Sequence, residues 1–362
     1  MRFLNIIPAA VVLAVSLVAD ASPVLPFRGR GCASTITDEV KQRFESEFRA
    51  LRTSSSASFK GTSGPTTVNV YFHVVMKDAT PAGGNIPDGQ ITQQLAVINQ
   101  AYNSTGINFN LKKVNKVFKP TWFTGVAPAN KYQTAMKNSL RKGGLSILTC
   151  TPLGAFENED AQGLLGYATF PSEYQYAPKD DGVVVLYSSL PGGSTENFNL
   201  GHTLTHEVGH WVGLYHTFQG GCGSTGDEVD DTPSEAGPAS GCPTGRDSCP
   251  NSPGVDPIHN FMDYSFDSCM NEFSKGQADR IKAQLAAYRL PKSGPLTPPE
   301  TTTSTTPEVP TTPATPESTV APETTVDPTS SEAPASSEPA QPETTPTETP
   351  VEAKPEERRW KY

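Results

Sequence analysis

The stretch from His206 to His216, HEVGHWVGLYH, combines side chains that could hold a metal ion and activate water. In a helix of about 3.6 residues per turn, His206 and His210 lie one turn apart on one face and can bind one ion. Glu207 follows the first histidine, where its carboxylate can take a proton from water without occupying a coordination position. The pattern predicts metal-dependent hydrolysis with Glu207 as the general base.

A third metal ligand is predicted beyond this helix. Gly213 lets the backbone turn sharply, because a residue without Cβ reaches positive φ cheaply, and the turn can bring His216 to the ion. Three imidazoles with one open position are typical of a catalytic zinc site. A trio of His202, His206 and His210 would instead spread over about 11–12 Å. We therefore interpret His202 as a cleft-side or capping residue.

The extended motif HExxHxxGxxH and the segment NFMDY at Asn260 to Tyr264 resemble the metzincin zinc endopeptidases. The surrounding sequence resembles their pappalysin family, particularly its secreted fungal members, over about residues 66–290. The resemblance implies a Met-turn, with Met262 as an apolar floor beneath the metal. It also implies that the Tyr264 hydroxyl steadies the oxyanion that develops during catalysis. Core packing is the alternative role for Tyr264.

The resemblance also implies a substrate-binding edge strand, which holds extended peptides by backbone hydrogen bonds. This strand is expected to contain Gly163, Leu164, Leu165, Gly166 and Tyr167. A buried hairpin without a binding role is the alternative for this segment.

The expected fold is an α+β, metzincin-like catalytic domain at 61–290, with a twisted mixed sheet, a backing helix and the zinc-site helix. An irregular, disulfide-stapled C-terminal subdomain should follow. Apolar, β-branched or alternating patterns predict strands at 67–76, 107–118, 145–150 and 181–190. Helical spacing of apolar residues predicts helices at 40–51, 91–102, 131–142 and 273–290.

The two ends of the chain differ in composition from this domain. An apolar run from Ile6 to Val18, followed by Ala19-Asp20-Ala21, predicts a signal peptide at 1–21, since a membrane span needs about 20 apolar residues. Residues 22–60 are either a short prosegment or an N-terminal brace. The Thr/Pro/Ser/Glu-rich stretch at 291–362 is expected to be a disordered tail. The protein should be secreted, and the tail could retain it near the cell wall.

Charge excludes one class of partner. Residues 297–362 contain 12 acidic and 4 basic residues, a net charge of −8 against −10 for the whole chain, so the folded body is close to neutral. No run of Lys and Arg suggests nucleic acid. The expected partners are protein or peptide substrates, with no membrane association, and we expect a monomer.

The six cysteines should form disulfides in an oxidising compartment. The pappalysin resemblance implies the pairs Cys222–Cys249 and Cys242–Cys269. For Cys32 two alternatives remain. It could pair with Cys150, or it could offer its thiolate to the zinc and keep a precursor inactive. We favour the disulfide, because Cys150 would otherwise stay unpaired.

Three further predictions concern the surface. Asn103-Ser104-Thr105 is a candidate N-glycosylation site. The oxygen-rich loop at 226–232 is a candidate for structural calcium, which prefers such ligands and which the resemblance makes plausible. Arg28, Arg30 and Arg52 are expected to be exposed and solvated, although they could be processing points.

Together these patterns predict a secreted zinc endopeptidase that hydrolyses extracellular proteins, for protein assimilation or host interaction. The first alternative is a wall-associated binding module with a structural zinc, which the intact histidines and Glu207 disfavour. The second is a processing protease of narrow specificity.

Overall fold

A computed structural model describes residues 30–54, 65–128, 131–140, 145–150, 164–223 and 225–289. The predicted signal peptide, the predicted tail and Gly163 of the expected edge strand lie outside the described residues.

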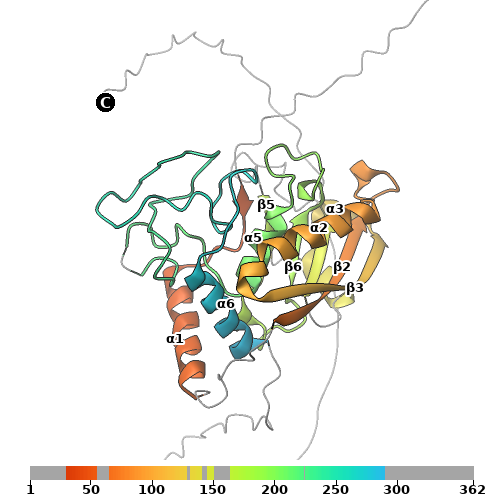
Figure 1. Cartoon of the computed structure of the whole chain (residues 1–362). Helices are drawn as coiled ribbons and strands as arrows, with labels where there is room; N and C mark the ends of the chain where they lie inside the picture. Colours follow the sequence, from red (N-terminus) through yellow and green to blue (C-terminus); the bar gives the residue numbers. More distant parts are fainter. Residues whose placement is uncertain are drawn as a thin grey trace, which may run out of the picture. The chain divides into compact units, whose positions relative to one another are not determined.

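A six-stranded mixed sheet runs from the centre to the right of the body in Figure 1, in the order β1-β5-β6-β4-β2-β3. Among the described strands, only β5 and β6 pair in antiparallel fashion, while the other four pairs are parallel. The strands are β1 (Gly31–Cys32), β2 (Thr66–Met76), β3 (Ile107–Phe118), β4 (Leu145–Cys150), β5 (Leu164–Ala168) and β6 (Val183–Leu186). The strand expected at 181–190 is shorter, because a 3₁₀ turn begins at Tyr187.

Helices cover both faces of this sheet. On one face lie α2 (Asp88–Ala101) and α5 (His202–Trp211). On the other lie α3 (Pro120–Gly125) and α4 (Lys131–Leu140). The side chains of β2 alternate accordingly, since Val74 joins the core beneath α5 whereas Val75 packs with Phe123 of α3. The 3₁₀ helices are η1 (Pro81–Gly83), η2 (Asn103–Thr105), η3 (Pro171–Glu173) and η4 (Tyr187–Ser189).

After α5 the chain continues through a long segment of turns, drawn at the left of Figure 1, to α6 (Lys275–Tyr288). Two disulfides hold this segment, Cys222–Cys249 and Cys242–Cys269, and they are the pairs that the resemblance implied. A segment with so many turns has little core of its own, so cross-links that restrict its unfolded state add stability. The helix α1 (Asp38–Ser54) lies beside α6.

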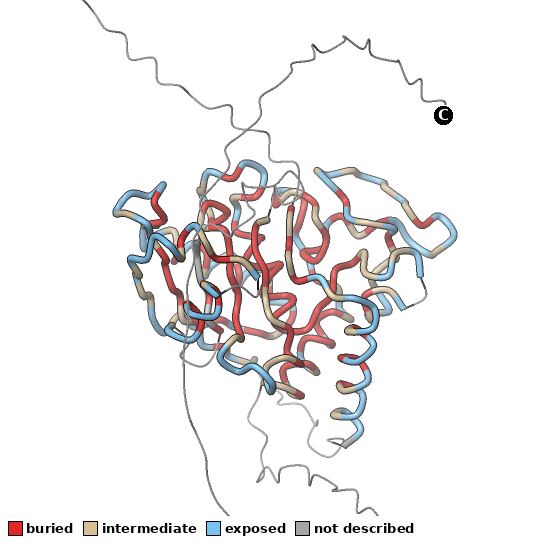
Figure 2. Tube along the Cα trace, turned by 180° about the vertical axis from the view of Figure 1, so that it is seen from behind, coloured by how far each residue is buried: buried red, intermediate tan, exposed pale blue. Residues whose placement is uncertain are grey.

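The core is continuous from the sheet to α5. Buried residues concentrate in the strands and in α5, while the outer face of α1 and the loops are exposed (Figure 2). Every residue of α5 except His202 is buried. The expected α+β architecture, with its backing helix and its histidine-bearing helix, is confirmed.

Candidate active site

Three imidazoles converge at the end of α5. His206 and His210 are fully buried and His216 is 2% exposed. Their Nε2 atoms lie 3.3 Å apart for His206 and His210, 3.0 Å for His210 and His216, and 3.2 Å for His206 and His216. Nitrogens at about 2.1 Å from one tetrahedral zinc ion would lie about 3.4 Å apart. The three ring nitrogens therefore fit one zinc ion.

The hydrogen bonds of two rings identify their tautomers. His206 Nδ1 lies 2.7 Å from the carbonyl oxygen of Phe261, and His210 Nδ1 lies 2.8 Å from that of Leu214. A carbonyl only accepts, so both Nδ1 atoms donate and both Nε2 atoms keep a free lone pair. Burial lowers the pKa of His206, and it lowers the pKa of His210 to about 4. Neutral imidazoles with such lone pairs are the form that binds zinc.

The turn after α5 brings in His216. Gly213 has φ 101°, which lies in the left-handed region that favours glycine.

The Met262 side chain, fully buried, packs beneath the helix, and a Cβ added at Gly209 would lie 2.3 Å from Met262 Sδ. Asn260 Oδ1 accepts from Met262 N at 3.0 Å and fixes this turn. Close packing of Gly209 against Met262 thus fixes the distance between α5 and the turn that contains Met262.

Glu207 lies beside the histidines, facing the edge of the sheet. It is 1% exposed, and burial raises the pKa of its carboxyl to about 8. A Cβ added at Gly166 would lie 2.7 Å from Glu207 Cγ. The Glu207 side chain therefore leaves no room for a side chain at this position of β5. A buried carboxyl with a raised pKa is suited to accept and return a proton near neutral pH.

The N-terminal segment enters this site. Cys32 is a buried free thiol, and its Sγ lies within 4.8 Å of the metal-facing nitrogens of all three histidines. Cys32 Sγ also lies 3.3 Å from Glu207 Oε2. The favoured disulfide to Cys150 was therefore wrong for this state of the chain. The spacing of the cysteines could not show that the fold places Cys32 beside the three histidines and not beside another cysteine.

Residues next to Cys32 occupy the edge of the sheet. β1 pairs with β5, and Ala33 N donates to Gly166 O at 3.1 Å. Ser34 Oγ accepts from Ala168 N at 2.7 Å and lies 3.3 Å from Glu207 Oε2. Residues Leu164 to Tyr167 do form a strand, and its outer edge binds another segment of chain through the backbone.

Arg30 was expected to be exposed, and this expectation was wrong. It is 4% exposed, and its Nη2 lies 2.5 Å from Asp267 Oδ1. Arg30 Nη1 donates to Thr203 Oγ1 at 3.3 Å, and the guanidinium lies 5.2 Å from the centre of the Phe198 ring. Asp267 Oδ2 also accepts from Leu200 N at 2.8 Å. Sequence reasoning missed Asp267, which lies in an irregular loop far from the histidines in sequence.

Two other predicted residues lie at the rim of the centre. The Tyr264 hydroxyl donates to the carbonyl oxygen of Cys32 at 3.4 Å, and its ring lies 5.1 Å from that of His216. His202 is the first residue of α5, and its Nδ1 lies 2.9 Å from the carbonyl oxygen of Asp267. His202 is absent from the group of metal-facing residues among the described part of the chain. Its interpretation as a residue at the start of the helix agrees with this position.

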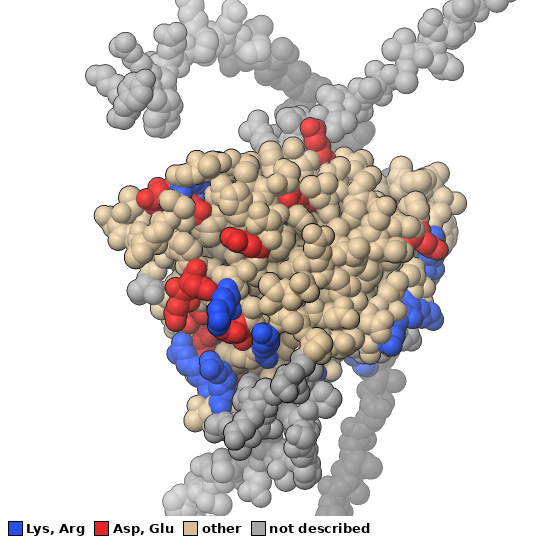
Figure 3. All heavy atoms as spheres, in the orientation of Figure 1, with Lys and Arg blue, Asp and Glu red and all other residues tan. Residues whose placement is uncertain are grey.

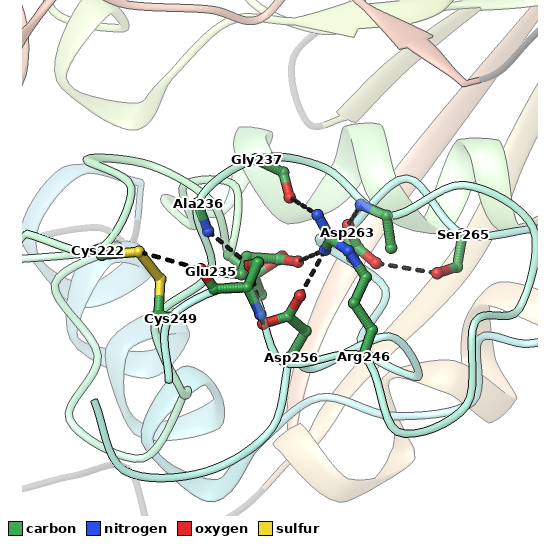
Figure 4. A network of polar contacts seen from close by, with 12 residues as sticks. Cys222, Glu235, Ala236, Gly237, Arg246, Cys249, Asp256, Asp263 and Ser265 are labelled. Atoms are coloured by element: carbon green, nitrogen blue, oxygen red, sulfur yellow. Dashed lines mark hydrogen bonds and ion pairs between the residues drawn. A yellow bond between two sulfur atoms is a disulfide. The ribbon is translucent and has the colours of Figure 1, made fainter. Parts of the chain in front are cut away.

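A polar network supports the segment after His216 (Figure 4). Thr217 Oγ1 donates to Glu235 Oε1 at 2.6 Å, and Arg246 Nη1 pairs with Glu235 Oε2 at 2.9 Å and with Asp256 Oδ2 at 2.7 Å. Asp263 lies close by and accepts from Ala239 N. Burial, with the neighbouring charges of Asp263 and Asp256, raises the pKa of Glu235 to about 8.

Two other predicted sites are the glycosylation site at Asn103 and the acidic loop at 226–232. Asn103 is exposed at the start of η2, so the glycan stays a prediction. In the acidic loop, Asp227 is 3% exposed; its Oδ1 accepts from Thr232 Oγ1 at 2.7 Å, and its Oδ2 has no hydrogen-bond partner among the described residues. Charged side chains of both signs gather over α1 and the start of α6 on the face shown in Figure 3. That face shows no broad basic patch of the kind a nucleic acid would need.

Comparisons with known proteins agree with this geometry. Residues 159–286 match the family described as pregnancy-associated plasma protein-A, and residues 89–217 match a reprolysin-like metallopeptidase family. An extracellular metalloprotease of Colletotrichum graminicola is 48% identical over 62% of this chain and 77% of its own length. Extracellular metalloprotease 1 of Coccidioides posadasii is 43% identical over 73% of this chain and 91% of its own length. The chain belongs to the pappalysin family of metzincins. It is a zinc metalloendopeptidase.

Solved structures of Tannerella forsythia mirolysin share the pappalysin-like fold. Mature mirolysin with a cleaved peptide is 28% identical, with a TM-score of 0.51, and covers 62% of this chain and 97% of its own. A promirolysin variant is 27% identical, with a TM-score of 0.55, and covers 72% and 95%. In the described part of this chain no helix is long and apolar enough to cross a membrane.

Proposed function

We propose that this pappalysin is a secreted endopeptidase that hydrolyses extracellular proteins and is made as a latent precursor. The observation that carries the activity is the convergence of three Nε2 atoms beside the buried Glu207 carboxylate. The relatives' description as extracellular supports secretion. Assimilation of external protein or host interaction is the role we propose.

Each residue has a proposed part in the reaction. His206, His210 and His216 would hold zinc, which when bound polarises the scissile carbonyl and makes water more acidic. Glu207 would accept a proton from the attacking water and deliver it to the leaving amine. Tyr264 would donate to the oxygen on which charge develops. Its hydrogen bond to the Cys32 carbonyl supports this role, because that carbonyl lies where a substrate peptide would pass.

Substrate would bind along β5. Ala33 and Ser34 now use Gly166 O and Ala168 N, which are the backbone groups that an extended peptide would need. The segment at 30–34 must therefore leave before cleavage begins. Cys32 would add a thiolate ligand to the zinc in the precursor and occupy the position that substrate requires.

The pocket of Asp267 suggests a side-chain preference. Arg30 inserts a guanidinium against a fully buried carboxylate, with the Phe198 ring beneath it. Once the segment leaves, this pocket would present an unpaired negative charge, which favours substrates with Arg or Lys next to the scissile bond. Such a preference would make the enzyme selective without limiting it to one partner protein.

The test of the activity compares the parent protein with its Glu207→Gln variant, each produced as the full chain. A denatured protein substrate is incubated with each, with and without a zinc chelator, after removal of the N-terminal segment. We expect cleavage by the parent that the chelator abolishes, and nearly none by the variant, which should retain its zinc. Retained hydrolysis in Glu207→Gln would contradict the assigned base. No cleavage by the zinc-loaded parent would favour the binding-module alternative.

We also propose a calcium site in the loop at 226–232, carried by the buried, unbonded Oδ2 of Asp227. Selective calcium removal with zinc retained should lower the melting temperature. An unchanged melting temperature would dismiss the site.

A further inference from the structure

The N-terminal helix α1 presents one buried face to the body. Its buried residues Lys41, Phe44, Glu45 and Phe48 recur at intervals of three, one and three residues, so they lie on one side of the helix. The rest of α1 is largely exposed. The facing surface, which we call the helix cradle, is formed by Phe170, Tyr215, Arg280 and Tyr288.

A desolvated ion pair lies at the centre of this contact. Glu45 pairs with Arg280, and the two side chains are 6% and 7% exposed. Glu45 Oε1 also accepts from the Tyr215 hydroxyl at 2.9 Å. Arg280 Nε donates to Gly213 O at 2.9 Å. Truncating Glu45 would leave a buried guanidinium without its counter-charge, which weakens such contacts strongly.

Aromatic rings surround this pair. Phe44 lies 6.0 Å from Phe170, measured between ring centres, and Phe48 stacks on Tyr288 at 6.3 Å. The Arg280 guanidinium lies 5.7 Å from the centre of the Phe48 ring. Burial of one Phe side chain alone changes a dissociation constant by about tenfold to a hundredfold. The cradle therefore holds α1 by several independent contacts.

The cradle also borders the metal centre. Tyr215 directly precedes His216, and the Phe170 ring lies 5.5 Å from that of His210. By contrast, the residues that obstruct the centre itself form a short segment, with Cys32 aimed at the histidines. The residues of the N-terminal segment that bind the body thus differ from the residues that obstruct the metal centre.

We propose that the helix cradle is the high-affinity docking site of the N-terminal segment, with Glu45 of α1 as its central anchor. The segment stays bound through α1 after it has been cut from the body, while Cys32 serves to block the centre. The blocking role of Cys32 rests on the proposed function, whereas the binding of α1 to the helix cradle does not. Promirolysin covers 72% of this chain and mature mirolysin 62%, which agrees with a part of this chain that is present only in the precursor.

The test separates the two parts of the segment in the full chain. A cleavage sequence for an unrelated protease is inserted at 55–64, which lies outside the described residues, in a Glu207→Gln background that cannot digest itself. After cutting, size-exclusion chromatography and dilution measure how tightly the N-terminal fragment remains bound. We expect the fragment to co-elute with the body, and Cys32→Ser to weaken its binding by no more than about tenfold.

Glu45→Gln should weaken fragment binding by about a hundredfold to a thousandfold. Glu39→Gln on the exposed side of the same helix is the matched control and should change nothing. Circular dichroism of the uncut variants verifies folding, and Phe44→Ala gives a second, uncharged probe of the cradle. Immediate release of the parent fragment would overturn the proposal. Release by Cys32→Ser without release by Glu45→Gln would do so as well. Because retention is a binding measurement, failure of the peptidase assay would leave its outcome unaffected.

Discussion

Arg30 and Asp267, 237 residues apart in sequence, form a buried ion pair in which Nη2 and Oδ1 are 2.5 Å apart and neither side chain is more than 1% exposed. Arg30 comes from the segment that covers the histidines, and Asp267 comes from the body. A buried carboxylate needs a positive partner, so removal of Arg30 creates a demand for another cation. We propose that Asp267, which binds Arg30 while the N-terminal segment covers the histidines, binds a basic substrate residue once that segment has left.

Asp267→Asn should reduce cleavage before or after basic residues more than cleavage elsewhere. Loss of the charge removes a charge-assisted hydrogen bond of about 1.5–3 kcal/mol, or about tenfold to a hundredfold in kcat/KM. The Asn side chain keeps an acceptor for Leu200 N. Matched peptides with Arg, Lys or Leu at each flanking position provide the measurement. Asp247→Asn, at an exposed carboxyl, is the control. An equal loss for all peptides would indicate structural damage instead of altered selectivity.

Cys32→Ser should give the uncut precursor measurable peptidase activity. The thiol faces three imidazoles, and a serine hydroxyl is a much poorer zinc ligand at neutral pH. If the lost ligation weakens closure by about 1.4 kcal/mol, the open fraction rises about tenfold. Hydrolysis of a short fluorogenic peptide by uncut precursor measures this, with Ser46→Ala on α1 as the control. If the uncut variant hydrolysed the peptide no faster than the uncut parent, the thiol would not be needed for latency.

The sequence predicted what local periodicity and motif spacing encode. The bounds of β3 and β4 agree with the predicted ones, and Gly213, with its φ of 101°, brings His216 back to the other two histidines. The expected strand at 181–190 was too long because its second half is as buried as its first, and burial alone does not separate a strand from a 3₁₀ turn.

The sequence could not reveal contacts between distant segments. Solvation is the usual state of an Arg side chain and was therefore expected for Arg30, yet its partner is Asp267. Glu45 and Arg280 are likewise joined only by the fold, 235 positions apart. Cys32 illustrates the limit best. Parity of cysteine number favoured a disulfide, but the path of the N-terminal segment brings this sulfur to the histidines.

Gly209→Ala should lower the stability of the protein and its affinity for zinc. The added Cβ would lie 2.3 Å from Met262 Sδ, so either α5 or the Met-turn must shift. Overpacking of this kind costs about 1–3 kcal/mol, and the shift would also disturb the bond between His206 Nδ1 and Phe261 O. We expect a lower melting temperature and weaker zinc binding in competition with a chromogenic chelator.

Gly89→Ala is the matched control for this substitution. It lies in the first turn of α2, and an added Cβ there would meet nothing within 4 Å. Alanine is favoured over glycine in a helix by up to about 1 kcal/mol, so this variant should be as stable as the parent or more stable. If both variants behaved alike, packing against Met262 would not be the reason for a glycine at 209.

Glu235→Gln should flatten the dependence of stability on pH above neutrality. Three buried carboxylates, Glu235, Asp256 and Asp263, lie around the single guanidinium of Arg246 (Figure 4). The pKa of Glu235 is raised from 4.5 to about 8, so between these values the native state holds a proton that the unfolded state has lost. Stability from this group is therefore fully present below pH 4.5 and is lost as pH rises through 8, by up to about 1.4 kcal/mol per pH unit.

Urea unfolding of the zinc-loaded chain between pH 6.5 and 8.5 measures this effect, since the histidines, whose pKa is lowered, lose stability only toward acid. Glu207 also has a raised pKa of about 8 and contributes equally to parent and variant, so it cancels in their difference. We expect the parent to lose about 1–2 kcal/mol more than Glu235→Gln over this range. Glu196→Gln, at an exposed position, should follow the parent. Parallel curves for parent and Glu235→Gln would mean that Arg246 keeps Glu235 ionised throughout and that another member of the cluster carries the proton.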